Sequence, residues 1–186
     1  MAETEILKKK KKKAYLLYAK EFDNVEIGET LASEDNLIIG RTIEVNLAQL
    51  TNDPKTQNIK IKFKIKEVKE NKGYAELNSY FMLPTYIRRV VKPAREKLED
   101  SFKLMTKDNI KIVVKPLLLT KALTQSSILS HLRKKTREFF NDYCKKNDYK
   151  KFLDDLIMHN LQRELKEVLK KVYPLSVAEI RLMEKL

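Results

Sequence analysis

The stretch from residue 59 to residue 66 constrains the fold of this chain more than any other. Four apolar residues alternate there with four lysines, the apolar ones being Ile59, Ile61, Phe63 and Ile65. Successive side chains of a strand point to opposite faces, so this alternation places the apolar groups on one face and the lysines on the other. The pair Lys72-Gly73 predicts a turn, and 74–83 is expected to return as the second strand of a hairpin.

Further segments carry the patterns of strands and helices. Strands are expected at 37–45, 98–105, 110–119 and 177–186, and helices at 85–92, 128–146, 152–157 and 161–172. Gly40 inside the first of these strands indicates a bulge or a close approach of another backbone. Strands dominate the first half, helices the second, and one strand closes the chain. This order predicts an α+β domain.

The helix expected at 128–146 is amphipathic. Six apolar residues fall within one arc of it: Ile128, Leu129, Leu132, Phe139, Phe140 and Tyr143. Arg133, Lys134 and Arg137 lie on its flank and opposite face, so we expect the apolar arc to pack on the sheet.

The positive charge of the chain is concentrated in three segments. The formal net charge is +13, and residues 1–13, 84–97 and 121–151 together account for all of it. Such clusters favour a polyanionic partner, because each neutralised phosphate releases a condensed counterion. An A/T-rich genome or a thermophilic organism can also give a Lys-rich composition, but neither explains why the charge is clustered. We therefore expect a nucleic acid as partner.

Residues 1–13 form a charged, low-complexity segment that offers little apolar surface to bury. We expect a disordered basic arm there, followed by a single α+β domain over 14–186. Tyr15 to Tyr18 supply an apolar plug that could dock the arm onto the domain. The lysines of the arm are also compatible with a nuclear-localisation-like or membrane-surface segment.

Two other basic patches leave alternatives open. The lysines at 60, 62, 64 and 66 are typical either of a solvated strand face or of contact with RNA. The helical cluster from Arg133 to Arg137 has the same two interpretations. Aromatic residues mostly fall in apolar patterns, so a base-stacking sheet is not indicated and phosphate and shape recognition is expected.

The residue types that carry catalysis or bind metals are scarce. The single cysteine, Cys144, excludes an intrachain disulfide, and with His131 and His159 it does not make a structural zinc site. Asp154 and Asp155 are adjacent and diverge on a helix, although a metal-dependent nuclease is the enzyme class they would suit. Three glycines exclude a glycine-rich phosphate loop. We expect no enzyme, no metal and no cofactor, and no apolar run is long enough to cross a membrane.

A family resemblance is carried by one block of sequence above all. Residues 40–53 read GRTIEVNLAQLTND, which resembles a Gly-Arg-x-x-Glu-Val-x-Leu-x-x-Leu-x-x-Asp signature. Further agreements are Ile27-Gly28-Glu29-Thr30, an entry segment from Lys13 to Phe22, the hairpin residues 107–109 and the ending 172–181. The family is the small-subunit ribosomal protein family "S-three-a", also called "S-one-e", of archaea and eukaryotes. Ala14 stands where the family has Trp, and Asn109 where it has Gly.

The resemblance implies an antiparallel β-barrel-like core with two to four helices packed against it. It implies a structural, non-catalytic protein of the cytoplasmic ribosome, archaeal in type, on the small-subunit platform near the mRNA exit. The expected partners are small-subunit rRNA, neighbouring platform proteins and mRNA near the exit, with no membrane and no small-molecule substrate. The alternative is a free RNA-binding or RNA-chaperone protein without sequence specificity.

The residues expected to contact rRNA were chosen mainly by their position in the basic patches. They are Lys8, Lys9, Lys10, Lys11, Lys12, Lys13, Arg41, Arg88, Arg89, Lys92, Lys121, Arg133, Lys134, Lys135 and Arg137. Only Arg41 lies inside the signature.

Overall fold

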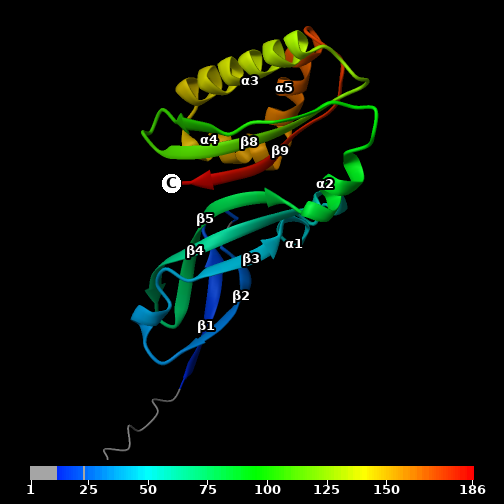
Figure 1. The fold of residues 1–186 in the computed structure, drawn as a ribbon. Helices are drawn as coiled ribbons and strands as arrows, with labels where there is room; N and C mark the ends of the chain where they lie inside the picture. The colour runs from blue at the N-terminus through cyan, green and yellow to red at the C-terminus, as the bar shows by residue number, and fades with distance from the viewer. Residues whose placement is uncertain (1–11, 23) are drawn as a thin grey trace, which may run out of the picture.

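One sheet and a layer of helices make up the protein (Figure 1). The structure is a computed structural model that describes residues 12–22 and 24–186. The strands are β1 (Lys13–Ala19), β2 (Val25–Ala32), β3 (Thr42–Asn46), β4 (Ile59–Lys69), β5 (Lys72–Met82), β6 (Lys97–Glu99), β7 (Phe102–Met105), β8 (Lys111–Thr120) and β9 (Leu175–Lys185). The α-helices are α1 (Leu47–Thr51), α2 (Pro84–Val90), α3 (Ser126–Lys146), α4 (Tyr149–Ile157) and α5 (Asn160–Lys170). The α+β class is confirmed.

The predicted hairpin forms the centre of the N-terminal half. β4 and β5 pair antiparallel, and the apolar side chains of 59–65 are buried while the lysines face outward. The turn is not at Lys72-Gly73, as predicted, but at Glu70 and Asn71, whose φ angles are 49° and 60°. Asn tolerates this left-handed conformation well, and Glu less so.

Gly73 instead lies inside β5, where another strand approaches closely. A Cβ at this position would lie 2.6 Å from Cδ2 of Leu17. β1 runs parallel to β5 here, with Leu17 opposite Gly73, and it pairs antiparallel with β2 on its other side. The apolar segment predicted to dock an arm is therefore a strand of the sheet. Its residues Tyr15 and Leu17 are buried because they face the core.

The strand expected at 37–45 forms only in its second part. A short 3-10 helix covers Asp35–Leu37, and β3 begins at Thr42. Between them Gly40 has a φ of 88° and donates its N–H to the Ile65 carbonyl at 2.8 Å. A Cβ at Gly40 would meet no atom within 4 Å, so the positive φ, and not a close approach of another backbone, accounts for glycine here. The same positive φ ends the strand pattern on its N-terminal side.

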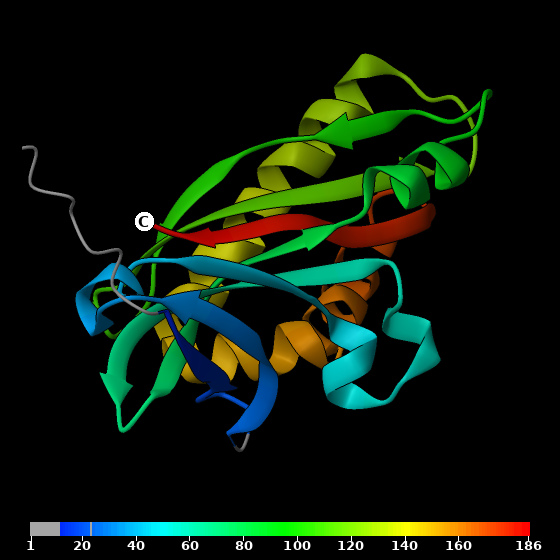
Figure 2. The ribbon, with the colours of Figure 1, turned by 90° about the horizontal axis from the view of Figure 1, so that it is seen from below.

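The last strand joins the two halves of the sheet. β9 pairs antiparallel with β8 along most of its length and with β5 at Ser79, Tyr80 and Phe81. Figure 2 shows β9 between these two neighbours. The main path of the sheet runs β2-β1-β5-β9-β8-β6, so the sheet is not closed, and one of its pairings, β1 with β5, is parallel. The strand expected at 98–105 is divided into β6 and β7 at Asp100 and Ser101.

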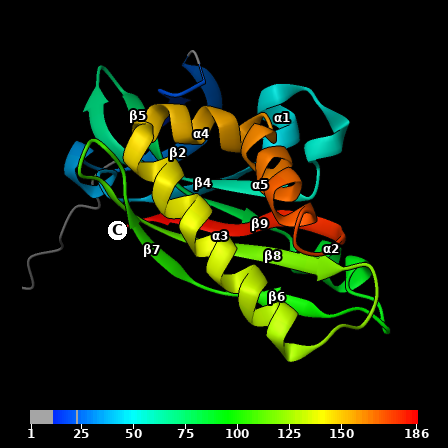
Figure 3. The same ribbon diagram turned by 90° about the horizontal axis from the view of Figure 1, so that it is seen from above.

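Three helices cover one face of the sheet. Figure 3 shows α3, α4 and α5 on the near side of the strands, with α3 crossing in front of β8 and β9. α3 buries Leu132, Thr136, Phe140 and Cys144, with Phe139 and Tyr143 partly buried beside them. The apolar arc predicted for this helix is thus the side that packs on the core. Its opposite side faces solvent, which positions the basic residues of α3 at the surface.

Candidate nucleic-acid interface

Much of the predicted basic arm is not covered by the structure. Lys8, Lys9, Lys10 and Lys11 lie outside the described residues. Lys12 and Lys13 are exposed. Lys13 is the first residue of β1.

Four of the six Lys and Arg residues of α3 lie in its middle, and we call them the α3 basic face: Arg133, Lys134, Lys135 and Arg137. All four are exposed. Arg133 lies on the β6–β7 side, with its Nε 3.6 Å from Oδ1 of Asp100. Lys135 donates to Oε2 of Glu138 at 3.0 Å on the outer side. Lys134 forms no hydrogen bond or ion pair with residues 12–22 or 24–186. The helix thus presents several cations in a row, because its buried side leaves them facing solvent.

A second basic group lies on α2. Pro84 starts this short helix, and Arg88 and Arg89 occupy its last turn, where positive charge complements the helix dipole. The guanidinium carbon of Arg89 lies 5.3 Å from the centroid of the Tyr86 ring. Its Nη2 also donates to Oδ1 of Asn58 at 3.4 Å. Lys92, just beyond the helix, is exposed.

Two predicted residues lie apart from these groups. Arg41, directly before β3, is in the other half of the sheet from α3 (Figure 1). Its Nη1 donates to Oγ1 of Thr30 at 2.8 Å and to the Leu31 carbonyl at 3.1 Å, which ties it to β2. Lys121 follows β8 and has an exposed side chain.

The lysines of β4 are interleaved with acidic residues of neighbouring strands. Lys60 pairs with Glu44 of β3 at 3.8 Å, and Lys66 pairs with Glu76 of β5. The Lys66 ammonium, with smaller contributions from Lys185 and Lys20, lowers the pKa of Glu76 against the opposing effect of its burial. Of the two interpretations of this stripe, the ion pairs favour the solvated face for Lys60 and Lys66.

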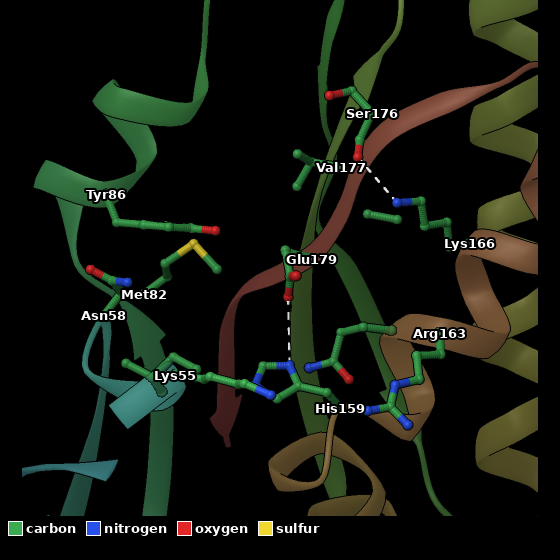
Figure 4. Close-up of a pocket in the computed structure, with 13 residues that line it drawn as sticks. Lys55, Asn58, Met82, Tyr86, His159, Arg163, Lys166, Ser176, Val177 and Glu179 are labelled. Carbon is green, nitrogen blue, oxygen red and sulfur yellow. Dashed lines mark hydrogen bonds and ion pairs between the residues drawn. The ribbon is translucent and has the colours of Figure 1, made fainter. Parts of the chain in front are cut away.

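A cavity of about 410 Å³ opens between α2, α5 and β9 (Figure 4). Tyr86 comes from α2, Arg163 and Lys166 from α5, and Glu179 from β9. Lys55 closes one side, from the short 3-10 helix Pro54–Thr56. Tyr86 and Asn58 line this cavity, and Arg89 of α2 contacts both of them. Arg89 therefore lies beside the cavity. We call Lys55, Arg89, Arg163 and Lys166 the cavity rim.

The floor of the cavity is a carboxylate in an unusual environment. Burial raises the pKa of Glu179 to about 7, with Lys166 acting in the opposite direction. His159 has its Nδ1 3.8 Å from Oε2 of Glu179, as Figure 4 shows. Burial, and then the charge of Arg163, lower the pKa of His159. Both effects favour the neutral forms of the two groups near neutral pH.

The polar atoms below this floor lie against one another. Oη of Tyr80, Oε1 of Gln162 and Oε2 of Glu179 are buried and form no hydrogen bond of ordinary geometry within the described part of the chain. The Tyr80 hydroxyl nevertheless interacts with the Gln162 amide, and His159 lies beside Oε2 of Glu179. Gln162 is only 3% exposed, and its Nε2 donates to the Leu156 carbonyl at 3.1 Å. This bond fixes the amide, so its oxygen is held in place.

The candidate nuclease pair does not form a joint site. Asp155 accepts hydrogen bonds from the Tyr143 hydroxyl and from Nδ2 of Asn160, whereas Asp154 is exposed. Across residues 12–22 and 24–186 there is no group of three or more His, Cys, Asp or Glu arranged to hold a metal ion. In the same residues no helix is long and apolar enough to cross a membrane.

Lys55, Arg163 and Lys166 belong to a basic surface that was not predicted from the sequence. Arg163 and Lys166 are three residues apart on α5, a spacing that puts them on one helix face. That spacing was the available signal, but nothing in the sequence placed α5 beside α2. The juxtaposition depends on β9 inserting between β5 and β8.

The chain matches the model of the Ribosomal S3Ae family over residues 4–186. It is 31% identical over 183 residues to small ribosomal subunit protein eS1 of Halorubrum lacusprofundi, which covers 97% of this chain and 85% of that protein. It is 34% identical over 153 residues to the protein of the same name from Nanoarchaeum equitans, with 82% of this chain and 77% of that protein covered. The eS1 protein of Methanopyrus kandleri is 29% identical over 167 residues, covering 88% and 79%.

Proposed function

This chain belongs to the Ribosomal S3Ae family, and from that premise we propose that it is a structural constituent of the small ribosomal subunit that binds rRNA through clustered Lys and Arg. The family is one of ribosomal structural proteins and not of enzymes. The relatives named above are small ribosomal subunit proteins, which supports the same role for this chain.

The observation that carries the rRNA-binding part is the α3 basic face. Exposed cations follow one another along a helix whose other side is anchored in the core by Leu132 and Phe140. Such a helix is a rigid support, so its cations can meet phosphates without a large cost in backbone ordering. Lys134 is exposed and makes no hydrogen bond or ion pair with the described residues, although its charge acts on nearby Glu138, so it can meet an RNA phosphate.

The rim of the α2–α5 cavity supplies a second surface for the same partner. Arg89 lies beside it through its contacts with Tyr86 and Asn58, and Lys55, Arg163 and Lys166 line it. We propose that the nearby Arg88 and Lys92 contact the same RNA. We propose that Lys121, Arg41 and the lysines of the N-terminal segment add further phosphate contacts. A guanidinium has five N–H donors, so Arg41 retains donors beyond the two bonds that its Nη1 makes.

We further propose the platform of the small subunit, near the mRNA exit, as the place of binding. Neighbouring platform proteins and mRNA near the exit are then the other partners. Basic surfaces on both halves of the molecule suit a protein that bridges several segments of rRNA.

The test is sucrose-gradient fractionation of native lysate with mass spectrometry across the fractions, repeated after a high-salt wash. Stoichiometric recovery with the small subunit after the wash is expected. Recovery in light fractions, or loss at modest salt, would overturn the proposal in favour of a free RNA-binding protein.

A further inference from the structure

We propose that the side of the sheet opposite the helical layer stacks a base of single-stranded RNA on the ring of Phe81, without selecting which base. The inference rests on the proposed function and deepens it, because it adds base stacking to phosphate binding. It also goes beyond the phosphate and shape recognition that the sequence led us to expect.

The strand register places Phe81 away from the helices. Its neighbour Tyr80 lies opposite Ile61 of β4 and Met183 of β9, and these three side chains are fully buried. The Tyr80 hydroxyl interacts with Gln162 of α5, so this buried side is the one that the helices cover. Successive side chains of a strand point to opposite faces, and Phe81 therefore points to the other side. Figure 2 views the strands from that side, opposite to the view in Figure 3.

Phe81 differs from the other phenylalanines in its packing. Each of the other six contacts an aromatic ring, as in the pairs Phe22–Phe63 and Phe102–Phe140. Among residues 12–22 and 24–186 the Phe81 ring has no such contact and no cation above it. It is partly exposed and belongs to neither of the two apolar core clusters. Part of a large apolar ring is thus open to a ligand.

Phe81 belongs to a row of side chains that crosses four strands. The register places Lys60 of β4 on one side of Phe81 and Leu182 of β9 on the other. Lys115 of β8 lies opposite Leu182 and ends the row. Directly opposite side chains on one face lie about 5 Å apart, so two adjacent apolar groups are flanked by two lysines. A flat base can lie on the Phe81 ring with Leu182 beside it.

The lysines around this row suit the phosphates next to a stacked base. Lys115 is exposed and Lys62, in the neighbouring row, is partly exposed, and neither forms a hydrogen bond or ion pair within the described chain. Lys60 pairs with Glu44 at 3.8 Å, and Glu184 in the neighbouring row offsets part of the positive charge. We therefore assign the phosphate contacts to Lys62 and Lys115. An aromatic ring beside cations binds single strands without sequence preference, because every base has a stacking face.

The test compares the full chain's affinity for two oligonucleotides of equal length and charge, measured by fluorescence anisotropy. One is an oligouridylate, and the other carries abasic tetrahydrofuran spacers at its central positions. The oligouridylate is expected to bind about tenfold more tightly, because only its central positions can stack. Phe81→Leu keeps an apolar neighbour for Leu182 but removes the flat ring, and should reduce the difference to about twofold or less. Phe81→Tyr keeps the ring and is the matched control, which should retain the full difference.

Salt dependence separates stacking from phosphate binding. Phe81→Leu should leave the slope of log affinity against log salt unchanged, whereas Lys62→Gln with Lys115→Gln should reduce it. Equal affinity of the unaltered protein for the two oligonucleotides, or the same difference in Phe81→Leu, would overturn the inference and leave the proposed function standing. Absence of salt-dependent binding of both oligonucleotides would overturn both.

A second measurement needs no variant and does not depend on the folding of Phe81→Leu. An oligouridylate with 5-iodouracil at its centre is bound to the unaltered protein and irradiated, and the cross-linked peptide is identified by mass spectrometry. Cross-linking at Phe81 is expected. Cross-links at other residues alone would overturn the inference.

Discussion

The guanidinium carbon of Arg137 lies 5.5 Å from the centroid of the Phe102 ring, so one predicted RNA contact is also part of the packing between α3 and β7. Lys134, three residues earlier on the same helix, is exposed and has no hydrogen bond or ion pair within residues 12–22 and 24–186. Both side chains carry one positive charge, but Arg137 also packs on Phe102, whereas Lys134 does not. A substitution of Lys134 is therefore expected to change RNA binding alone, and one of Arg137 to change both RNA binding and stability.

Replacing Arg133 and Lys134 by Gln is expected to weaken RNA binding and to reduce the slope of log affinity against log salt. Each lost phosphate contact should lower that slope by roughly 0.7–0.9. Lys69→Gln, at the tip of the β4–β5 hairpin, removes one exposed charge outside the α3 basic face and is the control. An unchanged slope in the double variant would mean that this face of α3 meets solvent and not RNA.

Deleting residues 1–11 is expected to reduce RNA affinity while leaving the melting temperature nearly unchanged. The strand β1 starts only at Lys13, and its first buried side chain is Tyr15. Extending the deletion through Ala19 should prevent folding, because it removes β1 from between β2 and β5. Differential scanning calorimetry and filter binding measure the two effects; a large loss of melting temperature in the shorter deletion would contradict the prediction.

The pair Glu70→Asn with Asn71→Gly is expected to stabilise the protein by about 1 kcal/mol. Both positions have positive φ angles, which Asn-Gly adopts with less strain than Glu-Asn. Urea unfolding measures the change in the free energy of unfolding. Asn71→Val should act in the opposite direction, and equal stability of the two variants would show that this turn is not strained.

The stability of the protein is expected to fall as the pH rises from about 4.5 to about 7, because burial raises the pKa of Glu179 from 4.5 to about 7. In that window the unfolded state has lost the proton that the folded state still holds. The stabilisation from the Glu179 proton is therefore complete below about pH 4.5 and is lost above about pH 7. It amounts to about 3 kcal/mol. Glu179→Gln should flatten this dependence in urea titrations at several pH values. The same slope in the variant would assign the effect to another group.

Elements with periodic patterns could be predicted from the residues alone. The alternation from Ile59 to Ile65 and the amphipathic helix around Leu132 and Phe140 both appear as predicted, because burial of one face follows directly from residue spacing. The order of strands and helices predicted the α+β class. The sequence of residues 40–53 indicated the family. The prediction of a strand from Leu37 was wrong in its first part, because a 3-10 helix and a positive φ at Gly40 interrupt the β-rich segment.

Which distant segments meet follows from the strand pairing of the folded protein. The pairing of β9 with both β5 and β8 brings Glu179 to the floor of a cavity between α2 and α5. Periodicity describes one element at a time and carries no information on the partner of a strand, as β1 beside Gly73 also shows. The basic rim and the buried polar atoms below it depend on this long-range strand pairing. The spacing of residues along the chain therefore did not reveal them.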